Sequence, residues 1–378
     1  MAAWEKAAVP IAAAINSVKG ETNTLSVGRH WASPLDEALH RNNMDRASLD
    51  AMMSAARGAF PHFRRYLRAK ARAIGVERLA WYDLFAPVGG DEATWRYVDA
   101  ESFILEHFAT YSADMHDLAS RAFAERWIDA EPRAGKVDGA FCMRLRADES
   151  RILTNFRPSF SGVRTLAHEL GHAYHNLRLA TRTPLQRSTP MVLAETASNF
   201  CETIVREASL KTASRPEQLV ILENTLQSAC QVVVDITCRY AFEQETFERR
   251  RDRELSVSEL NDTMRRAQLE TYGDALDPDL LHPYMWAAKP HYYGQNYYNF
   301  PYMFGLLFGL GLYARYQEAP DSFRSSYDDL LSRTGMADAA ELSSRFGIDI
   351  RAPEFWASSL DLIRADVDRF EALVADGV

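Results

Sequence analysis

The stretch GVRTLAHELGHAYHNL, residues 162–177, decides how this chain is interpreted. It contains HELGH, an instance of the pattern H-E-x-x-H, in which two histidines four residues apart lie on one face of a helix. His168 and His172 can therefore reach one metal ion, while Glu169 lies next to that ion without having to bind it. The spacing predicts a hydrolytic zinc site on a helix.

An ordinary helix with satisfied polar side chains is the alternative to a metal site. An apolar stripe at helical spacing argues against it, because the stripe predicts a buried helix, and burying two histidines with a glutamate needs a compensating partner such as a metal. His175 lies outside the histidine pair, and we expect it to be structural or to support a ligand. The stripe consists of Leu166, Leu170, Ala173 and Leu177.

A catalytic zinc ion usually has three protein ligands and one open position, so a third ligand is needed. Glu195 is the candidate, because it follows Pro190 in a segment that we expect to be helical and lies in a largely uncharged run. Glu202 is seven residues further on and therefore on the same helical face. Although an exposed helical glutamate is the commoner fate of either residue, we expect Glu195 to bind the metal and Glu202 to support the ligands.

These two segments, HELGHAYH and AETASNFCE, resemble the oligoendopeptidase F branch of the thimet-oligopeptidase-like (M3) family of zinc metallopeptidases. In that family the two histidines and the glutamate of the second segment bind zinc, and the glutamate inside HExxH is the general base. The resemblance therefore implies one Zn²⁺ per chain, held by His168, His172 and Glu195, with Glu169 as the base.

One region, residues 128–160, is predicted to be β-like, because proline and glycine interrupt it and ILTNF, residues 152–156, is a strand-like run. We expect an edge strand in which Ile152, Leu153 and Thr154 pair with an extended peptide substrate through main-chain hydrogen bonds. A sheet that only supports the metal helix is the alternative, and the resemblance favours the substrate role. It also implies a mainly α, zincin-like catalytic domain with a small β-sheet beside the HExxH helix.

A second constellation is KPHYYGQNYYNFPYMFGLLFGLGLYARY, residues 289–316, which places a histidine and many tyrosines ahead of an apolar helix. Aromatic runs more often pack in a core than take part in catalysis. However, Gly294 gives the loop conformational freedom, and a phenol can donate to the negative oxygen that develops when water adds to a peptide carbonyl. The loop therefore has the chemistry that the metal site still lacks.

The same loop resembles the family, whose members carry a histidine, a tyrosine-rich loop and a helix similar to YNFPYxFGxLF. In those enzymes the loop side chains bind substrate and stabilise the tetrahedral intermediate. The resemblance implies this catalytic role for His291, Tyr298 and Tyr302. Adjacent aromatic residues make the register ambiguous, so Tyr297 and Tyr293 are alternatives, and we expect Tyr297 to contact substrate.

The composition, 47% apolar and 25% charged residues over 378 positions, is ordinary for a globular protein. A net charge of -9 argues against nucleic acid and against an acidic membrane surface as partners. The N-terminal segment lacks the features of a secretory signal, and no apolar run reaches the roughly 20 residues of a membrane span. We expect reduced cysteines and a cytoplasmic protein. The cysteines are Cys142, Cys201, Cys230 and Cys238.

No linker or internal repeat divides the chain, so we expect a single catalytic region over residues 1–378. In this interpretation residues 1–90 are a helical remnant of the family's longer N-terminal part, and residues 91–378 form the zinc catalytic core. A cleft that lacks part of its wall would expose apolar surface, which a homodimer would cover.

The predicted function is zinc-dependent cleavage of internal peptide bonds in short oligopeptides. The alternative is an N-terminally truncated homologue, weakly active or inactive, that binds zinc and peptides and needs a partner chain. A carboxypeptidase is a third reading, disfavoured because AETASNFCE and YNFPY resemble the endopeptidases better. Cobalt or manganese would also suit nitrogen and oxygen ligands.

Overall fold

The computed structural model describes residues 1–89, 94–146 and 148–377. Its contacts divide the chain into two compact units, each assembled from separate parts of the sequence. Unit 1 comprises residues 1–88, 226–304 and 351–377, and unit 2 comprises residues 89–225 and 305–350. The N-terminal helices thus share a compact unit with later segments, while the single catalytic region and its N-terminal remnant, residues 1–90, stay predictions.

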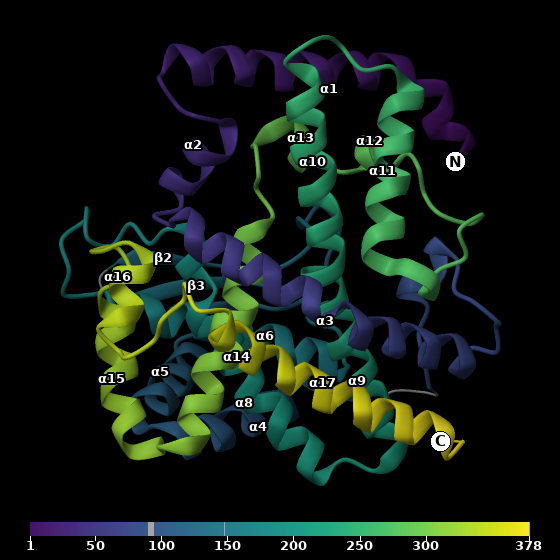
Figure 1. Cartoon of the computed structure of the whole chain (residues 1–378). Coiled ribbons are helices and arrows are strands. Elements are labelled where there is room, and N and C mark those ends of the chain that lie inside the picture. The colour runs from purple at the N-terminus through teal and green to yellow at the C-terminus, as the bar shows by residue number, and fades with distance from the viewer. Residues whose placement is uncertain (90–93, 147, 378) are drawn as a thin grey trace. The chain divides into compact units, whose positions relative to one another are not determined.

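The regular elements of unit 1 in the described residues are helices, and one isolated β-bridge joins Leu79 to Leu276. Helices α3 and α17 pack along each other, and Figure 1 shows them side by side. A second core joins α1, α10 and α11 through residues such as Ile15, Phe242 and Met264. The elements are α1 Ala2–Gly28, α2 Pro34–Arg41, α3 Arg46–Ala73, η1 Trp81–Phe85, η2 Gln231–Asp235, α10 Ile236–Arg250, α11 Val257–Tyr272, η3 Gly273–Ala275, α12 Met285–Ala288, α13 His291–Gly294 and α17 Pro353–Ala375.

Two local features of unit 1 follow from particular side chains. Helix α3 continues through Pro61, where apolar residues on both sides of the proline, Phe60 and Phe63, are buried. The segment after residue 79 contains the 3-10 helix η1. The Asp83 carboxylate accepts a hydrogen bond from the backbone N–H of Ala80 at 2.9 Å and so closes this turn.

Unit 2 contains the HExxH helix, α6, which packs against α8 and against the small sheet. Its elements are α4 Tyr97–Tyr111, α5 Ala113–Ala124, β1 Ile128–Asp129, β2 Phe141–Arg146, β3 Glu149–Leu153, α6 Phe160–Arg178, α7 Met191–Ala194, α8 Thr196–Thr212, α15 Pro320–Ser332 and α16 Ala339–Ser344. Helices and one small sheet confirm the predicted mainly α fold class.

Two helices, α9 Arg215–Cys230 and α14 Phe300–Glu318, contain residues of both units. With η2 and α10, α9 forms one helical run, Arg215–Arg250, which is long and apolar enough to cross a membrane by length and composition alone. Its most apolar window is 61% buried inside the protein, and buried core helices pass the same test. The run is therefore weak evidence for a membrane span.

The sheet has the strand order β1-β3-β2, which corrects the prediction for ILTNF. Strand β3 is central: Ile152 pairs with Ile128 of β1 and with Cys142 of β2, and Leu153 is paired on both sides as well. The backbone N–H of Thr154 donates to the Asp129 carbonyl at 3.0 Å. The main chains of Ile152, Leu153 and Thr154 therefore cannot pair with a substrate as predicted. Strand β1, which has only two residues and is too short to recognise in the sequence, already occupies the edge of β3 that was expected to be open.

The edge strand on the other side is β2, which pairs only with β3 in the described part of the chain. Three of its side chains are exposed apolar groups. They are Phe141, Met143 and Leu145. An open main-chain edge beside the metal helix therefore exists, but on a different strand from the one expected.

Candidate metal centre

The metal helix α6 forms as the sequence predicts. Ser159 is its N-cap, and the backbone N–H of Gly162 donates to the Ser159 hydroxyl at 3.4 Å. Leu166 and Leu170 of the predicted stripe are fully buried. The two metal-binding candidates lie on another face of the helix, where their side chains are only partly exposed.

Gly171, inside HELGH, allows α8 to approach α6 closely. A Cβ atom at this position would lie 2.6 Å from the carbonyl oxygen of Ala197 and 2.7 Å from the Cα atom of Ser198. No side chain fits there, because real Cβ atoms do not approach other atoms so closely. The glycine of the motif thus brings the start of α8 onto the histidine-bearing helix.

Glu195 lies at the junction of α7 and α8, where the sequence predicts one helix. Its Oε2 atom is 3.2 Å from Nε2 of His168 and 3.4 Å from Nε2 of His172. One ligand atom from each of the three residues lies within 4.8 Å of the others. The structure therefore brings together the three side chains that the sequence predicts as metal ligands.

Neighbouring groups hold the Glu195 carboxylate in this position. The Ser198 hydroxyl donates to its Oε2 atom at 2.7 Å. Gly305 of α14 lies against the stem of the side chain, since a Cβ there would be 2.5 Å from the Cβ of Glu195. The carboxylate is thus fixed from two sides before any ion is bound.

Glu202, which the sequence predicts to support the ligands, lies beside His168. Its Oε2 atom lies 3.3 Å from Nδ1 of His168, and Arg164 donates from Nε to the other carboxylate oxygen at 3.0 Å. A carboxylate beside Nδ1 favours the imidazole tautomer whose Nε2 lone pair points at the metal position. Sequence reasoning missed Arg164, although it lies four residues before His168 and so on the same face.

Charge interactions and hydrogen bonds among His168, Glu195 and Glu202 shift the pKa values of all three side chains in the metal-free chain. Burial lowers the pKa of His168, but hydrogen bonds and charge interactions with Glu195 and Glu202 outweigh it and raise that pKa to about 10. Burial opposes ionisation of Glu195, yet the two histidines hold its pKa well below the usual value. Against burial, Arg164 and His168 lower the pKa of Glu202 to about 2.

Glu169 differs from Glu195 and Glu202, because one of its buried carboxylate oxygens has no hydrogen-bond partner among the described residues. It is only 4% exposed, and among the described residues no group donates a hydrogen bond to its Oε2 atom. Burial raises its pKa, although the neighbouring His168 and His172 act in the opposite direction. A buried carboxylate oxygen without a partner is costly, and it is ready to accept a proton from a bound water molecule.

The donor set fits a divalent transition-metal ion. Two imidazole nitrogens and one carboxylate oxygen converge on one point, held by supporting hydrogen bonds, which is the ligand set of catalytic zinc sites with an open fourth position. The partnerless oxygen of Glu169 lies on the residue next to the first ligand. Metal binding and water activation are the chemistry that this arrangement supports.

The predicted catalytic loop is assembled within unit 1. The His291 ring stacks on Tyr298, with ring centroids 4.8 Å apart and planes inclined by 26°. The Tyr298 hydroxyl lies 2.8 Å from that of Tyr302. These three side chains are therefore brought together with one another, as the sequence predicts, whereas the metal ligands belong to unit 2.

Tyr297 differs from its prediction. It has a positive φ of 52°, its ring is 5% exposed, and it stacks on Phe247 at a centroid distance of 5.4 Å. This burial contradicts the predicted substrate contact, because the backbone turn directs the ring into the core. The alternative residue Tyr293 donates its hydroxyl to the carbonyl oxygen of Trp286 at 3.1 Å.

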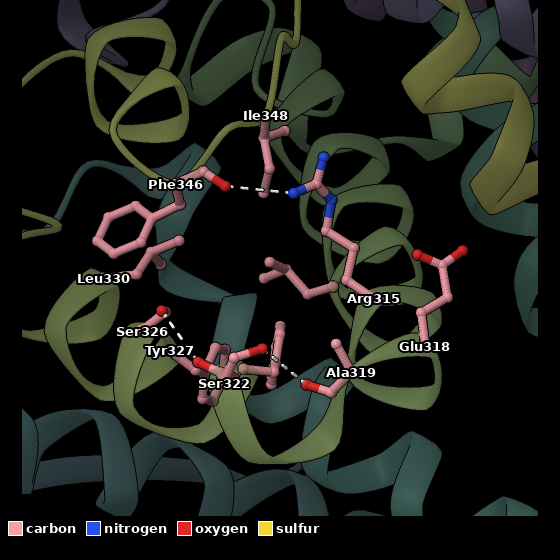
Figure 2. Close-up of a pocket in the computed structure, with 11 residues that line it drawn as sticks. Arg315, Glu318, Ala319, Ser322, Ser326, Tyr327, Leu330, Phe346 and Ile348 are labelled. Carbon is pink, nitrogen blue, oxygen red and sulfur yellow. Dashed lines mark hydrogen bonds between the residues drawn. The ribbon is translucent and has the colours of Figure 1, made fainter.

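A separate pocket of about 390 Å³ lies in unit 2, between the end of α14, α15 and residues 346–348 (Figure 2). Arg315 on its wall donates to the carbonyl oxygens of Phe346 at 3.2 Å and Gly347 at 2.7 Å. No predicted site residue lines this pocket.

Comparisons with known proteins match most of this chain. The family model of peptidase family M3 matches residues 12–362. An oligoendopeptidase F homolog from Lactococcus lactis subsp. lactis is 26% identical over 353 residues, which cover 93% of this chain and 59% of that protein. The oligopeptidase PepF of Bacillus subtilis is 22% identical over 350 residues, which cover 92% of this chain and 52% of that protein.

Solved structures show the same fold. A putative peptidase from Chlamydophila abortus matches with a TM-score of 0.86 at 21% identity, over 98% of this chain and 62% of that chain. Oligoendopeptidase-F from Enterococcus faecium matches with a TM-score of 0.76 at 20% identity, over 99% and 62%. The chain thus spans about three fifths of the length of these relatives. Because the family model matches most of its length, the chain belongs to peptidase family M3.

Proposed function

We propose that this protein is a zinc-dependent endopeptidase that hydrolyses internal bonds of short oligopeptides. The observation that carries the proposal is the convergence of His168, His172 and Glu195 beside the partnerless buried oxygen of Glu169. Membership of family M3 and similarity to oligoendopeptidase F relatives support peptides as substrates. Since the chain spans only 59% of such a relative, the activity is inferred for this chain from its own site.

His168, His172 and Glu195 hold the zinc ion, which when bound polarises the scissile carbonyl and acidifies a water molecule. Glu169 takes a proton from the attacking water on its Oε2 atom and returns it to the leaving amine, a role that contributes about 10²- to 10⁴-fold. Burial raises its pKa, so the carboxylate accepts a proton more readily than an exposed glutamate would. Glu202 keeps the His168 ring oriented throughout.

His291, Tyr298 and Tyr302 are proposed to donate hydrogen bonds to the oxygen that becomes negative in the transition state. Each well-placed donor of this kind contributes on the order of 3 kcal/mol. Their mutual stacking and hydrogen bonding supports the proposal, because a preassembled group loses little freedom on binding substrate. The open edge of β2, and not the ILTNF strand, is proposed to pair with the main chain of the substrate.

Location and assembly are also proposed. All four cysteines are free, which supports the reducing cytoplasm as the location. The exposed side chains of Phe141, Met143 and Leu145 on β2 support a homodimer that covers them. The molecular mass in solution tests the dimer.

The function is tested by metal analysis and peptide cleavage on one purified sample, with and without a chelator. About one zinc per chain and chelator-sensitive cleavage of an internally quenched peptide are expected. Product analysis should show internal cleavage; stepwise loss from the C-terminus would indicate a carboxypeptidase. Zinc without cleavage would move the function to binding or to a complex with a partner chain, and a metal-free, chelator-insensitive protein would refute the proposal.

Zinc binding should release a proton from His168. With a pKa of about 10 in the metal-free chain, this imidazole is protonated at pH 7.5 to 8.5, whereas a zinc ligand must be neutral. Apparent zinc affinity should therefore rise about tenfold per pH unit over this range. Calorimetry in buffers of different ionisation enthalpy measures the released protons, and an affinity independent of pH would contradict the expectation.

A further inference from the structure

The segment 289–299, which carries His291 and Tyr298, is anchored to one face of a single helical run. Asp235, Arg239 and Glu243 recur every fourth residue from the π-helical turn η2 into α10, so their side chains share a face. All three are buried charged residues, at most 7% exposed. Such a stripe of alternating charge inside a protein needs partners, and the loop supplies them.

Arg239 contacts the loop at two points, each next to a catalytic candidate in the sequence. Its guanidinium donates from Nη1 to Oδ1 of Asn299 at 3.1 Å, and its own carbonyl oxygen accepts from the Tyr292 hydroxyl at 3.4 Å. Asn299 directly follows Tyr298, and Tyr292 directly follows His291. Arg239 thus joins the two ends of the loop from which the catalytic side chains project.

The neighbouring acidic residues complete the anchor. Asp235 accepts a hydrogen bond from Arg239, and its carboxylate lies 3.9 Å from Nζ of Lys289, at the start of the segment. Glu243 accepts from the backbone N–H of Tyr297 at 3.2 Å, and its other oxygen pairs with Lys19 at 2.6 Å. Every few residues, therefore, the loop is tied to the same helical face.

Stability by itself does not account for this arrangement. Replacing a buried ionic group with apolar residues of similar volume is often neutral or stabilising, so a buried network of this kind is weak evidence for a purely stabilising role. It does define one geometry, because a planar guanidinium forms its hydrogen bonds in fixed directions. Burial and the charges of Arg239 and Lys289 also lower the pKa of His291, which keeps that imidazole neutral.

We propose that Arg239 is a positioning residue for catalysis, which acts through Asn299 to set where Tyr298 stands beside His291. This inference rests on the proposed function of the loop as the oxyanion-binding element. Arg239 touches neither substrate nor metal in this proposal. Its contribution is to hold the hydroxyl within the narrow range of positions that a transition state accepts.

The test is Asn299→Leu, which keeps a side chain branched at Cγ and removes the acceptor of the Arg239 hydrogen bond. It should lower kcat about 10- to 100-fold while KM changes by less than about threefold, because misplacing a catalytic group affects the transition state more than substrate binding. Asn299→Asp restores an acceptor and should recover most of the loss. The zinc content should equal that of the parent in both variants.

Asn42→Leu is the matched control, because Asn42 is equally buried, at 6%, and its side chain likewise bonds within unit 1, to the Ala38 carbonyl at 2.8 Å. A comparable loss of kcat in the control would show that the loss in Asn299→Leu comes from lower protein stability, and would overturn the proposal. The double variant with Tyr298→Phe separates the remaining cases. If Asn299 acts through Tyr298, the double variant should be about as slow as Tyr298→Phe alone.

Each contrary result has one meaning. The positioning role is overturned if the losses of kcat in the two single variants multiply in the double variant. It is also overturned if Asn299→Leu has the kcat of the parent while Tyr298→Phe is slow. Both results leave the proposed function standing. A parent-like Tyr298→Phe instead refutes the proposed role of that tyrosine. Hydrogen exchange is a readout without turnover: amides of residues 291–299 should exchange about tenfold faster in Asn299→Leu than in Asn42→Leu, and equal rates would overturn the anchor.

Discussion

Glu169→Gln should keep the metal and remove turnover, lowering kcat by about 10²- to 10⁴-fold. Glutamine has nearly the same shape, so it fits the buried position of Glu169, but its carboxamide cannot take a proton from water. The three ligand side chains are unchanged, so the zinc content should stay at the parent value. Metal analysis and initial rates on the same preparation measure both quantities.

Glu106→Gln is the control for this substitution. Glu106 is an exposed residue of α4 in the same unit, away from the ligand set, and the change should leave both zinc content and kcat near the parent values. A Glu169→Gln variant as active as the parent would show that another group is the base. Loss of zinc in that variant would instead assign Glu169 to metal binding.

Gly171→Ala should weaken metal binding although alanine ordinarily favours a helix. The added methyl group would lie 2.6 Å from the Ala197 carbonyl oxygen, so α8 must move away from α6 and carry Glu195 with it. Overpacking of this kind costs about 1–3 kcal/mol of the free energy of unfolding. Displacing one of three ligands should lower zinc affinity about 10- to 100-fold, as measured by competition with a chromogenic chelator.

Gly58→Ala provides the matched control. Gly58 is also inside a helix, α3, but a Cβ there meets no atom within 4 Å. The same substitution should therefore raise the melting temperature slightly, through better helix propensity of up to about 1 kcal/mol, and leave zinc affinity unchanged. Equal zinc affinities in the two variants would show that the close approach of α8 does not position Glu195.

Local spacing made the metal helix predictable from the sequence. Two histidines four residues apart share a helical face wherever that helix packs, and the apolar stripe with Leu166 and Leu170 indicated that it would be buried. The need for a third ligand and the largely uncharged run around Glu195 indicated that residue, and the family resemblance implied the same assignment. The mainly α fold, the three candidate ligands and the His291 loop followed from these patterns.

Tertiary structure alone decided what depends on contacts between distant segments. The pairing of Ile128 with Ile152 made β3 a central strand, and the core around Phe247 buried Tyr297, neither of which a local pattern reveals. The hydrogen bonds from Arg164 to Glu202 and from Arg239 to Asn299 likewise join residues 38 and 60 positions apart. The sequence by itself determined which side chains can do the chemistry, because helical periodicity is local. Long-range packing decided which of them meet.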